Sequence, residues 1–550
     1  MTHPSGGSAP TVIVIGGGHN GLTCAAYLAR AGLRVTVLER RDILGGACVT
    51  EELMPGYRCS TASLVTSLFR PEIAADLDLA AHGLEFIPRN PSVVALFPDG
   101  RHLSLGSDER ACVAEVAKFS KADADAYPAY GRTMRRLADH IEPLLMNPLP
   151  GLARPLDPGA RNGHAPGRYG SADAAAVLRD ALRRAAELPG DDLPMLMELL
   201  TGSAAGFLDR WFESDAIKVP LVIDGITGVD ASPSMPGSAY LMLYHMTGVT
   251  EVGRPAWGQV RGGMGGITAA LASAARSHGA VIRTDAPVAR IVTRDGQATG
   301  VVLASGEELS ADAVVSAADP YTTFVRLMAA DALPGRYRRA MENRRFQGVA
   351  MKMHLALDRL PEVRGFPPGL GPQHNATMLI APTMEYLEEA YADARAGRPS
   401  ANPHIEATVP SVLDPTVAPE GRHLMGLYIQ YAPYRLAGAS WDDIRESYAD
   451  RVLECMEEYL PGITDSVVDR CVLTPLDLER RLGLTGGDLY HGAMTADQLF
   501  FLRGGTGPSS HHTPVEGLYL CGSGAHPGGG VFGVPGRNGA HVVMSDLDRS

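Results

Sequence analysis

The first forty residues contain the feature that most restricts the fold. Thr11–Ile15 is a continuous apolar, β-branched run, as expected for a buried parallel strand. Residues 16–21 form a glycine-rich turn, and residues 22–31 have helical composition and stop before Gly32, a residue that commonly ends helices. Residues 34–39 form a second apolar run. Strand, glycine turn, helix and strand within about thirty residues predict a Rossmann-type βαβ unit and an α/β fold.

Three glycines of the turn indicate a nucleotide site. Gly16, Gly18 and Gly21 follow the pattern GxGxxG. The first permits the tight turn, the second lets the backbone approach a pyrophosphate, and the third lets the helix pack closely against the strand. Alone, the pattern also fits an ordinary glycine-rich turn, but here a strand precedes it and a helix follows. Because Glu39 ends the second strand, where its carboxylate can accept from ribose hydroxyls, the unit predicts dinucleotide binding.

Two more glycine-rich segments bear on the kind of dinucleotide. Gly45 and Gly46 follow the second strand closely; a simple NAD domain does not require them, and a β-turn is the alternative interpretation. Near the C-terminus, the strand at 517–521 leads into the glycine-rich residues 522–530 and a helix at 531–546. The positive end of that helix could stabilise the negative charge of a reduced flavin, whereas the alternative is a loop that closes the sheet.

Nucleotide-binding signals lie at both ends of the chain and in its middle. Residues from about 69 to 252 are predicted to be mainly helical, with a long loop rich in proline, glycine and arginine at 146–171. This order predicts two discontinuous domains. We expect a cofactor-binding domain from residues 1–69, 252–330 and 480–550, and a substrate domain from residues 70–251 and 331–479.

Composition excludes several classes of function. The chain has 49 Lys and Arg against 62 Asp and Glu, a net charge of −13, which does not suit a nucleic-acid-binding protein. No apolar run is long enough to cross a membrane, and the first ten residues lack the apolar segment of a secretory signal. The seven cysteines are scattered, so we expect no metal site and reduced thiols in a cytoplasmic protein. Contact with a membrane surface and homo-oligomer formation stay open.

Several segments resemble the phytoene desaturase and carotenoid isomerase-like FAD flavoproteins. They are residues 12–32, 37–52, 257–280, 311–320 and 518–542. Residues 405–434 and 473–500 are similar to the branch of that family named pyridine nucleotide-disulphide oxidoreductase domain-containing protein 2. The resemblance implies a glutathione-reductase-type Rossmann domain that binds FAD non-covalently, with an inserted substrate domain of sheet plus helices.

The resemblance also implies which residues contact FAD. The residues expected around its ADP part are Gly16, Gly18, Gly21, Glu39, Arg40, Gly45, Gly46 and Ala47. Val288 is expected on the adenine side, and further expected contacts are His19, Asn20, Thr61 and Ala317. The residues expected near the flavin are Gly522, Val531, Phe532 and Gly533.

The chain departs from true disulfide reductases at their redox-active cysteines. Those enzymes place a second cysteine five positions after the first, whereas here Cys48 is followed at that spacing by Leu53, and Cys59 lies eleven residues away. We therefore expect no disulfide reductase activity. A second nucleotide turn is also doubtful, because residues 262–266 lack a downstream acid and fit the start of a helix better than an NAD(P)H site.

The leading hypothesis is an FAD-dependent dehydrogenase or desaturase. A largely apolar organic substrate would give a hydride to flavin N5, and O₂, a quinone or another acceptor would reoxidise the flavin. His491 and His526 are candidates for a catalytic base, with structural histidines as the alternative. A polyene isomerase that uses FAD without net redox change, and a flavin-binding regulatory protein without enzyme activity, are the other hypotheses.

Overall fold

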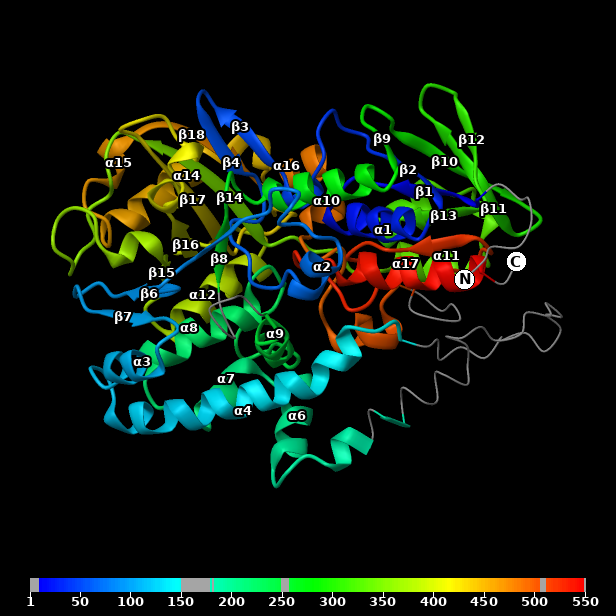
Figure 1. Ribbon diagram of the computed structural model, residues 1–550. Coiled ribbons are helices and arrows are strands. Elements are labelled where there is room, and N and C mark those ends of the chain that lie inside the picture. Colours follow the sequence, from blue (N-terminus) through cyan, green and yellow to red (C-terminus); the bar gives the residue numbers. More distant parts are fainter. Residues whose placement is uncertain (1–8, 150–178, 181–182, 249–256, 505–510, 549–550) are drawn as a thin grey trace.

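The computed structural model describes residues 9–149, 179–180, 183–248, 257–504 and 511–548. Most of the loop expected at 146–171 therefore lies outside the described residues. Two large sheets lie at opposite sides of the molecule, and helices cover them (Figure 1).

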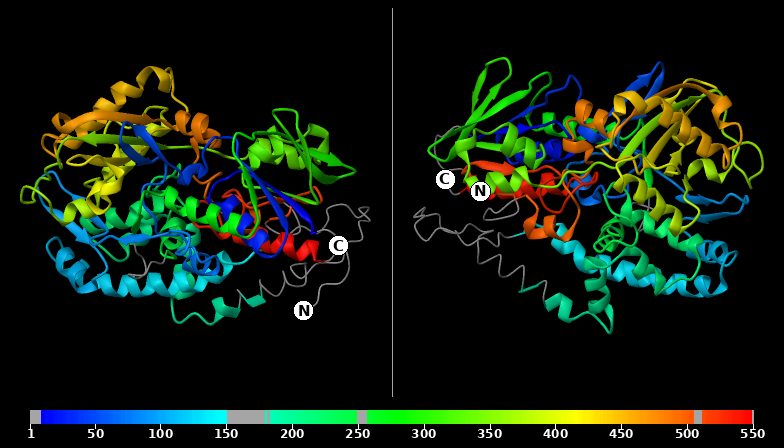
Figure 2. Two further views of the ribbon diagram at one scale, coloured as in Figure 1. Left: turned by 45° about the horizontal axis from the view of Figure 1, so that its top comes forward. Right: turned by 180° about the vertical axis from the view of Figure 1, so that it is seen from behind.

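The first sheet is entirely parallel and contains the predicted βαβ unit. Its strands, in spatial order, are β19 (Leu518–Leu520), β13 (Ala313–Ser316), β1 (Thr11–Ile15), β2 (Arg34–Leu38) and β9 (Val281–Arg283). On one face α1 (His19–Arg30) contacts both α10 (Gly265–Ser277) and α17 (Val534–Leu547), as Figure 2 shows from two sides. The Rossmann-type unit is confirmed, and segments from the two ends and the middle of the chain form one sheet.

The other face of this sheet packs on a smaller antiparallel sheet. That sheet comprises β10 (Val288–Arg294), β11 (Gln297–Leu303) and β12 (Glu308–Ser310). Successive side chains of a strand point to opposite faces of the sheet. Val12 and Val14 of β1 therefore face the helices, while Ile13 and Ile15 face the smaller sheet. This second core also includes Tyr337 of α11 (Gly335–Glu342), so it extends beyond the boundary expected at residue 330.

The second large sheet has seven strands. Their spatial order is β18 (Val467–Leu473), β14 (Ala350–Leu357), β17 (His423–Gln430), β16 (His404–Thr408), β15 (Thr377–Ile380), β6 (Val93–Leu96) and β7 (His102–Leu105). One face packs on α14 (Trp441–Glu457) through a fully apolar core. The last two strands differ from the mainly helical prediction for residues 69–252, because four-residue strands carry little local signal and are stabilised by pairing with β15 and each other.

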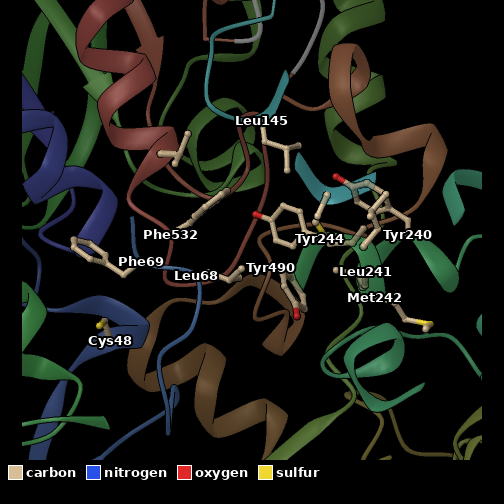
Figure 3. Packing of buried hydrophobic residues seen from close by; sticks show 14 of the residues in the cluster. Cys48, Leu68, Phe69, Leu145, Tyr240, Leu241, Met242, Tyr244, Tyr490 and Phe532 are labelled. Carbon is tan, nitrogen blue, oxygen red and sulfur yellow. The ribbon is translucent and has the colours of Figure 1, made fainter. Parts of the chain in front are cut away.

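Helices form a layer beneath the seven-stranded sheet in Figure 1. They are α4 (Lys121–Leu145), α6 (Asp192–Thr201), α7 (Ala204–Asp209), α8 (Asp215–Ile226) and α9 (Ala239–His245). Aromatic side chains join this layer to the C-terminal turn: the ring of Tyr244 packs edge-on against Phe532, 5.6 Å between centroids, and its hydroxyl donates to the Gly529 carbonyl at 2.8 Å (Figure 3). The turn expected beside the flavin is therefore held by this helical layer.

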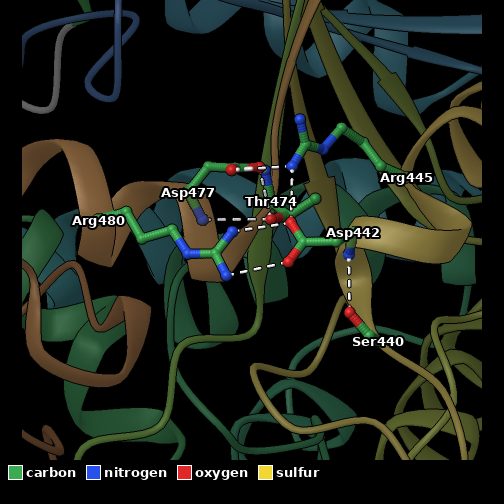
Figure 4. Close-up of polar contacts among 6 residues, drawn as sticks. All are labelled: Ser440, Asp442, Arg445, Thr474, Asp477 and Arg480. Carbon is green, nitrogen blue, oxygen red and sulfur yellow. Dashed lines mark hydrogen bonds and ion pairs between the residues drawn. The ribbon is translucent and has the colours of Figure 1, made fainter.

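A short helix, α16 (Pro475–Leu482), lies at the junction of the two large sheets. Thr474 caps it by accepting from the Asp477 amide, and the Asp477 carboxylate accepts in return from Thr474 (Figure 4). Asp442, at the start of α14, accepts two hydrogen bonds from Arg480 at 2.7 and 2.9 Å. These contacts fix the segment that follows α16, five residues of which line the cavity described below.

Further described helices and strands complete the chain. They are α2 (Pro71–Asp76), α3 (Glu109–Val116), α12 (Met384–Arg395), α13 (Pro410–Leu413), α15 (Ile463–Ser466), β3 (Thr50–Met54), β4 (Tyr57–Ser60), β5 (Phe86–Pro88) and β8 (Gly258–Val260). Among the described helices, none is both long enough and apolar enough to cross a bilayer.

Candidate functional site

A cavity of about 410 Å³ lies between the two large sheets. One end is formed by the carboxyl ends of β1, β2 and β13, which is where ligands bind in open parallel sheets. The other end is formed by the face of the seven-stranded sheet that does not pack on α14. One continuous space therefore joins the predicted nucleotide turn to the second sheet.

The glycine turn at the first end has the geometry of a phosphate site. Gly16, Gly18 and Gly21 all line the cavity, and a Cβ on Gly21 would lie 2.1 Å from the Gly16 carbonyl oxygen, so only glycine allows α1 to begin there. Gly18 is the N-cap of α1 and provides no side-chain cap, which leaves the first amides of the helix free. The buried Asn20 Oδ1, which also has no hydrogen-bond partner among the described residues, lies in the same lining.

Glu39 closes this end of the cavity. Its carboxylate accepts from the Gly17 amide at 2.8 Å and from the Arg41 amide at 2.9 Å, which orients it toward the space where a ribose would lie. Gly45 bridges Gly18 in parallel fashion, so the Gly45–Gly46 pair runs beside the turn. Arg40, Gly46, Ala47, Val288 and Ala317 line the cavity with them, as expected.

The C-terminal turn meets the N-terminal turn directly. The side-chain amide of Asn20 donates through Nδ2 to Ser523 Oγ at 3.1 Å, and His19 Nε2 lies 3.1 Å from the Gly530 carbonyl oxygen. Burial lowers the pKa of His19 to about 4, so the ring is neutral and donates to that carbonyl. Val531 lines the cavity beside Gly530. Two segments about five hundred residues apart in the sequence thus form adjacent walls.

Five residues expected at the cofactor do not line the cavity. Gly45 and Gly533 adopt positive φ angles of 132° and 78° and shape the backbone behind the wall. Gly522 is required by packing, because a Cβ there would lie 2.3 Å from the Ala317 carbonyl oxygen. Thr61 is buried and donates to Glu51 at 2.8 Å, while Phe532 points into the aromatic core beside Tyr244.

The two candidate bases have different positions. His491 lines the cavity with a positive φ of 58°, and its buried Nδ1 has no partner among the described residues. Burial lowers its pKa, and the nearby carboxylate of Asp319 opposes that shift. His526 lies outside the lining, because its Nε2 donates to the Leu144 carbonyl at 2.8 Å. Burial also lowers the pKa of His526 to about 3, so this ring serves packing in the observed geometry.

Cys48 and Cys59 are separate, buried thiols. Cys48 is fully buried and donates to the Met264 carbonyl, and burial raises its pKa to about 12. Cys59 is a separate free thiol whose pKa is also raised to about 12, mainly by burial. A protonated thiol is a poor nucleophile, which agrees with the expected lack of disulfide chemistry.

The glycines at 262–266 have a structural role. The Gly262 amide donates to Asp414, the Met264 amide to Ser60 Oγ and the Gly265 amide to Thr50 Oγ1. These amides are therefore already used by the protein at the start of α10. None of these glycines lines the cavity.

The second end of the cavity contains residues that the sequence interpretation missed. Lys352, Glu406 and Tyr428 line it from three neighbouring strands, together with Thr377 and Thr408. Lys352 did offer a signal, since it is one of only four lysines in the chain and interrupts a strongly apolar strand. The apolar wall comes from Leu64, Val65, Leu68, Trp257 and Leu489.

These observations fit FAD. The uncapped start of α1, the free Asn20 Oδ1 and the Glu39 carboxylate offer donors and acceptors where a pyrophosphate and a ribose would lie. Arg40 and Arg326 add positive charge to the same lining. The adjoining glycine-rich C-terminal turn extends the wall away from the nucleotide end, as a cofactor longer than a mononucleotide requires.

Comparison with known proteins agrees with this geometry. A model of the family "Flavin containing amine oxidoreductase" matches residues 21–534. The chain is 44% identical to "Pyridine nucleotide-disulfide oxidoreductase domain-containing protein 2" of Rattus norvegicus, covering 97% of this chain and 93% of that protein. It is 27% identical to "Phytoene desaturase (neurosporene-forming)" of Cereibacter sphaeroides, covering 98% and 94%.

A solved structure shares the fold across the whole chain. Cyclohexylamine oxidase from Brevibacterium oxydans IH-35A superposes with a TM-score of 0.58 at 16% sequence identity, covering 98% of this chain and 100% of that one. The expected family resemblance and fold class are thereby confirmed. The chain belongs to the flavin-containing amine oxidoreductase family, it is an oxidoreductase, and its cofactor is FAD.

Proposed function

We propose that the protein is a dehydrogenase or desaturase that removes a hydride from an organic substrate with a largely apolar body. The continuous cavity is the observation that carries this proposal, because it lets a substrate lying on the seven-stranded sheet reach the cofactor end. When bound, FAD supplies a two-electron acceptor at N5 for that hydride, and O₂, a quinone or another acceptor then takes the electrons.

The protein's own residues hold and enclose the reactants. The start of α1 and Glu39 bind the ADP part, and the turn at 528–531 supports the far part of a non-covalently held cofactor. Leu64, Leu68 and Trp257 give the substrate an apolar wall that excludes water. The relative named as a phytoene desaturase supports an apolar substrate body, although its substrate is a property of that protein.

The proton balance needs no strong base. His491 is the one predicted histidine base that faces the cavity, and burial favours its neutral form, which can accept a proton. Where the carbon that loses the hydride is adjacent to stabilised carbon, the proton can instead leave to water. We therefore expect replacement of His491 by alanine to slow the reaction without abolishing it.

Anaerobic mixing with candidate substrates tests the proposal. We expect the flavin band near 450 nm (an approximate general property of flavins) to bleach, with slower bleaching when the abstracted hydrogen is deuterium. Product formed while the flavin stays oxidised would favour the isomerase hypothesis. Lack of both bleaching and product across a broad panel of organic substrates would favour a binding protein.

A further inference from the structure

A row of three polar side chains crosses the cavity face of the seven-stranded sheet. Lys352 on β14 lies directly opposite Tyr428 on β17, and Tyr428 lies directly opposite Glu406 on β16. Residues opposite each other in neighbouring strands project to the same face, about 5 Å apart. Pairing therefore places the three side chains together, and all of them line the cavity.

The same strands are apolar on their other face. Met351, Met353, Ile405 and Leu427 alternate with the row and belong to the core beneath α14. Apart from His423 at the first position of β17, the polar residues of these three strands lie on the face that bounds the cavity. This pattern indicates that the row serves the cavity and not the stability of the sheet.

Lys352 is a buried amine that has no hydrogen-bond or ion-pair partner among the described residues. Its side chain is 3% exposed, and its Nζ lies 3.9 Å from the centre of the Tyr428 ring. Within the described part of the chain, Nζ makes no hydrogen bond and no ion pair within 4.0 Å. Burial lowers the pKa of Lys352 to about 7, and Glu406 opposes the shift. An ammonium buried in this way is costly unless another group accepts from it.

Glu406 has spare capacity to accept. It receives one weak hydrogen bond, from Thr227 Oγ1 at 3.3 Å. His404 Nε2 lies 3.5 Å away, but burial lowers the pKa of His404 to about 3, so that ring brings no positive charge. The Glu406 side chain is 21% exposed, and burial raises its pKa to about 7 while Lys352 opposes the rise.

The other charged side chains nearby do not pair with Lys352 or Glu406. Arg89 donates to the Asn375 carbonyl and to Thr377 Oγ1, so its guanidinium is already engaged. Asp224 is a neighbouring carboxyl whose pKa burial raises to about 7. The gap between Lys352 and Glu406 therefore offers a donor on one side and an acceptor on the other.

We propose that this row binds the polar head of an amphipathic substrate, and that the head is a hydroxyl. A hydroxyl accepts from Lys352 and donates to Glu406, while the body lies along Leu64, Leu68 and Trp257. A hydrocarbon leaves both protein groups unsatisfied. A carboxylate is attracted by protonated Lys352 but repelled by ionised Glu406, and an ammonium is attracted by Glu406 but repelled by Lys352, so neither satisfies both groups. This inference rests on the proposed function, because it names the substrate class of the same cavity.

Binding to the FAD-loaded full-length protein tests the inference without turnover. The probes are octan-1-ol, 1-chlorooctane, octanoate and octylamine, which share one chain and differ in the head. Binding is measured by calorimetry and by perturbation of the flavin spectrum. We expect octan-1-ol to bind about tenfold or more tightly than each of the others, the scale of one or two net hydrogen bonds.

Two variants locate the effect. Lys352→Met and Glu406→Leu should each reduce the preference for the alcohol over 1-chlorooctane to about twofold or less, because each removes one hydrogen-bonding partner of the hydroxyl. Lys121→Met, at the exposed start of α4, and Glu385→Leu, at the exposed start of α12, are the matched controls and should keep it. Replacing a buried unpaired charge by an apolar side chain need not destabilise the fold, and FAD content and unfolding temperature check this.

The outcomes separate this inference from the proposed function. Equal binding of octan-1-ol and 1-chlorooctane, tighter binding of octanoate or octylamine, or an alcohol preference that survives in both variants overturns the hydroxyl site. An alcohol preference that the native protein shows and both variants lose supports the hydroxyl site, even where no substrate bleaches the flavin. The absence of bleaching counts against the dehydrogenase proposal alone.

Discussion

Two glycines of the N-terminal turn have different physical roles. A Cβ on Gly21 would collide with the Gly16 carbonyl, so Gly21 is required for the fold. A Cβ on Gly18 would meet no atom of the described residues closer than 3.9 Å. Gly18 is therefore free of packing limits, and its lack of a side chain matters for what lies in the cavity.

Gly18→Val should give a folded protein that lacks FAD. The added methyl groups enter the cavity at the start of α1, where the pyrophosphate approaches. FAD released on denaturation and the unfolding temperature are the measurements. Gly335→Ala is the control, since its Cβ would make an ordinary 3.7 Å contact with Arg339 away from the cavity. A Gly18→Val protein with full FAD content would show that the cofactor lies elsewhere.

Cys48→Ser should keep both bound FAD and the rate of flavin reduction. Burial raises the thiol pKa to about 12, so the thiol stays protonated at every pH well below that value and does not act as a nucleophile. Anaerobic reduction kinetics of the loaded variant provide the test, with Cys59→Ser as the comparison. Loss of turnover in Cys48→Ser alone, with FAD still bound, would reinstate thiol chemistry.

Among the elements, the irregular segment after α16 depends on one buried arginine. Arg503 is fully buried and donates to main-chain carbonyls of Tyr490, Ala493 and Ser523. Burial lowers its pKa to about 10, which leaves it charged at neutral pH. It thereby ties the segment that carries Tyr490 and His491 to the C-terminal turn, in place of a regular helix or strand.

Arg503→Met should lower the free energy of unfolding by about 3 kcal/mol or more, because several buried carbonyls lose their donor at once. Urea unfolding of the FAD-loaded protein measures it. Arg359→Met removes an exposed pair with Asp358 and should change stability by less than about 0.5 kcal/mol. Equal losses in the two variants would contradict the role assigned to Arg503.

At the scale of the whole molecule, one cavity joins two sheets and one nucleotide turn serves it. The glycine-rich start of α10 has its amides occupied by Asp414, Ser60 and Thr50. The cavity is therefore arranged for FAD and an organic substrate, and its described lining includes no second nucleotide turn.

NADH and NADPH should not reduce the bound flavin on the time scale of substrate turnover. The physical reason is the lack of free amides at α10 for a second pyrophosphate. Anaerobic stopped-flow mixing measures the rate, and dithionite provides the positive control for a reducible flavin. Rapid bleaching by micromolar NADH would instead assign a nucleotide site to the α10 turn.

The local sequence was sufficient to predict those parts of the fold that depend on interactions between residues close together in the chain. The apolar run of β1, the GxGxxG turn and Glu39 predicted the βαβ unit, because turn geometry and strand burial depend on residues close together in the chain. The spacing of Cys48 and Leu53 likewise argued against a dithiol before any geometry was known.

Tertiary structure alone decided the rest. Lys352, Tyr428 and Glu406 lie up to 76 positions apart and become neighbours only through the register of β14, β17 and β16. His526 turns to a carbonyl of α4 and leaves the cavity, a contact across 382 positions. Strand register and side-chain direction are set by which distant segments pair, and this information is spread over the whole chain. The sequence by itself therefore determined the cofactor end of the cavity, whereas only the tertiary structure determined the end that faces the substrate.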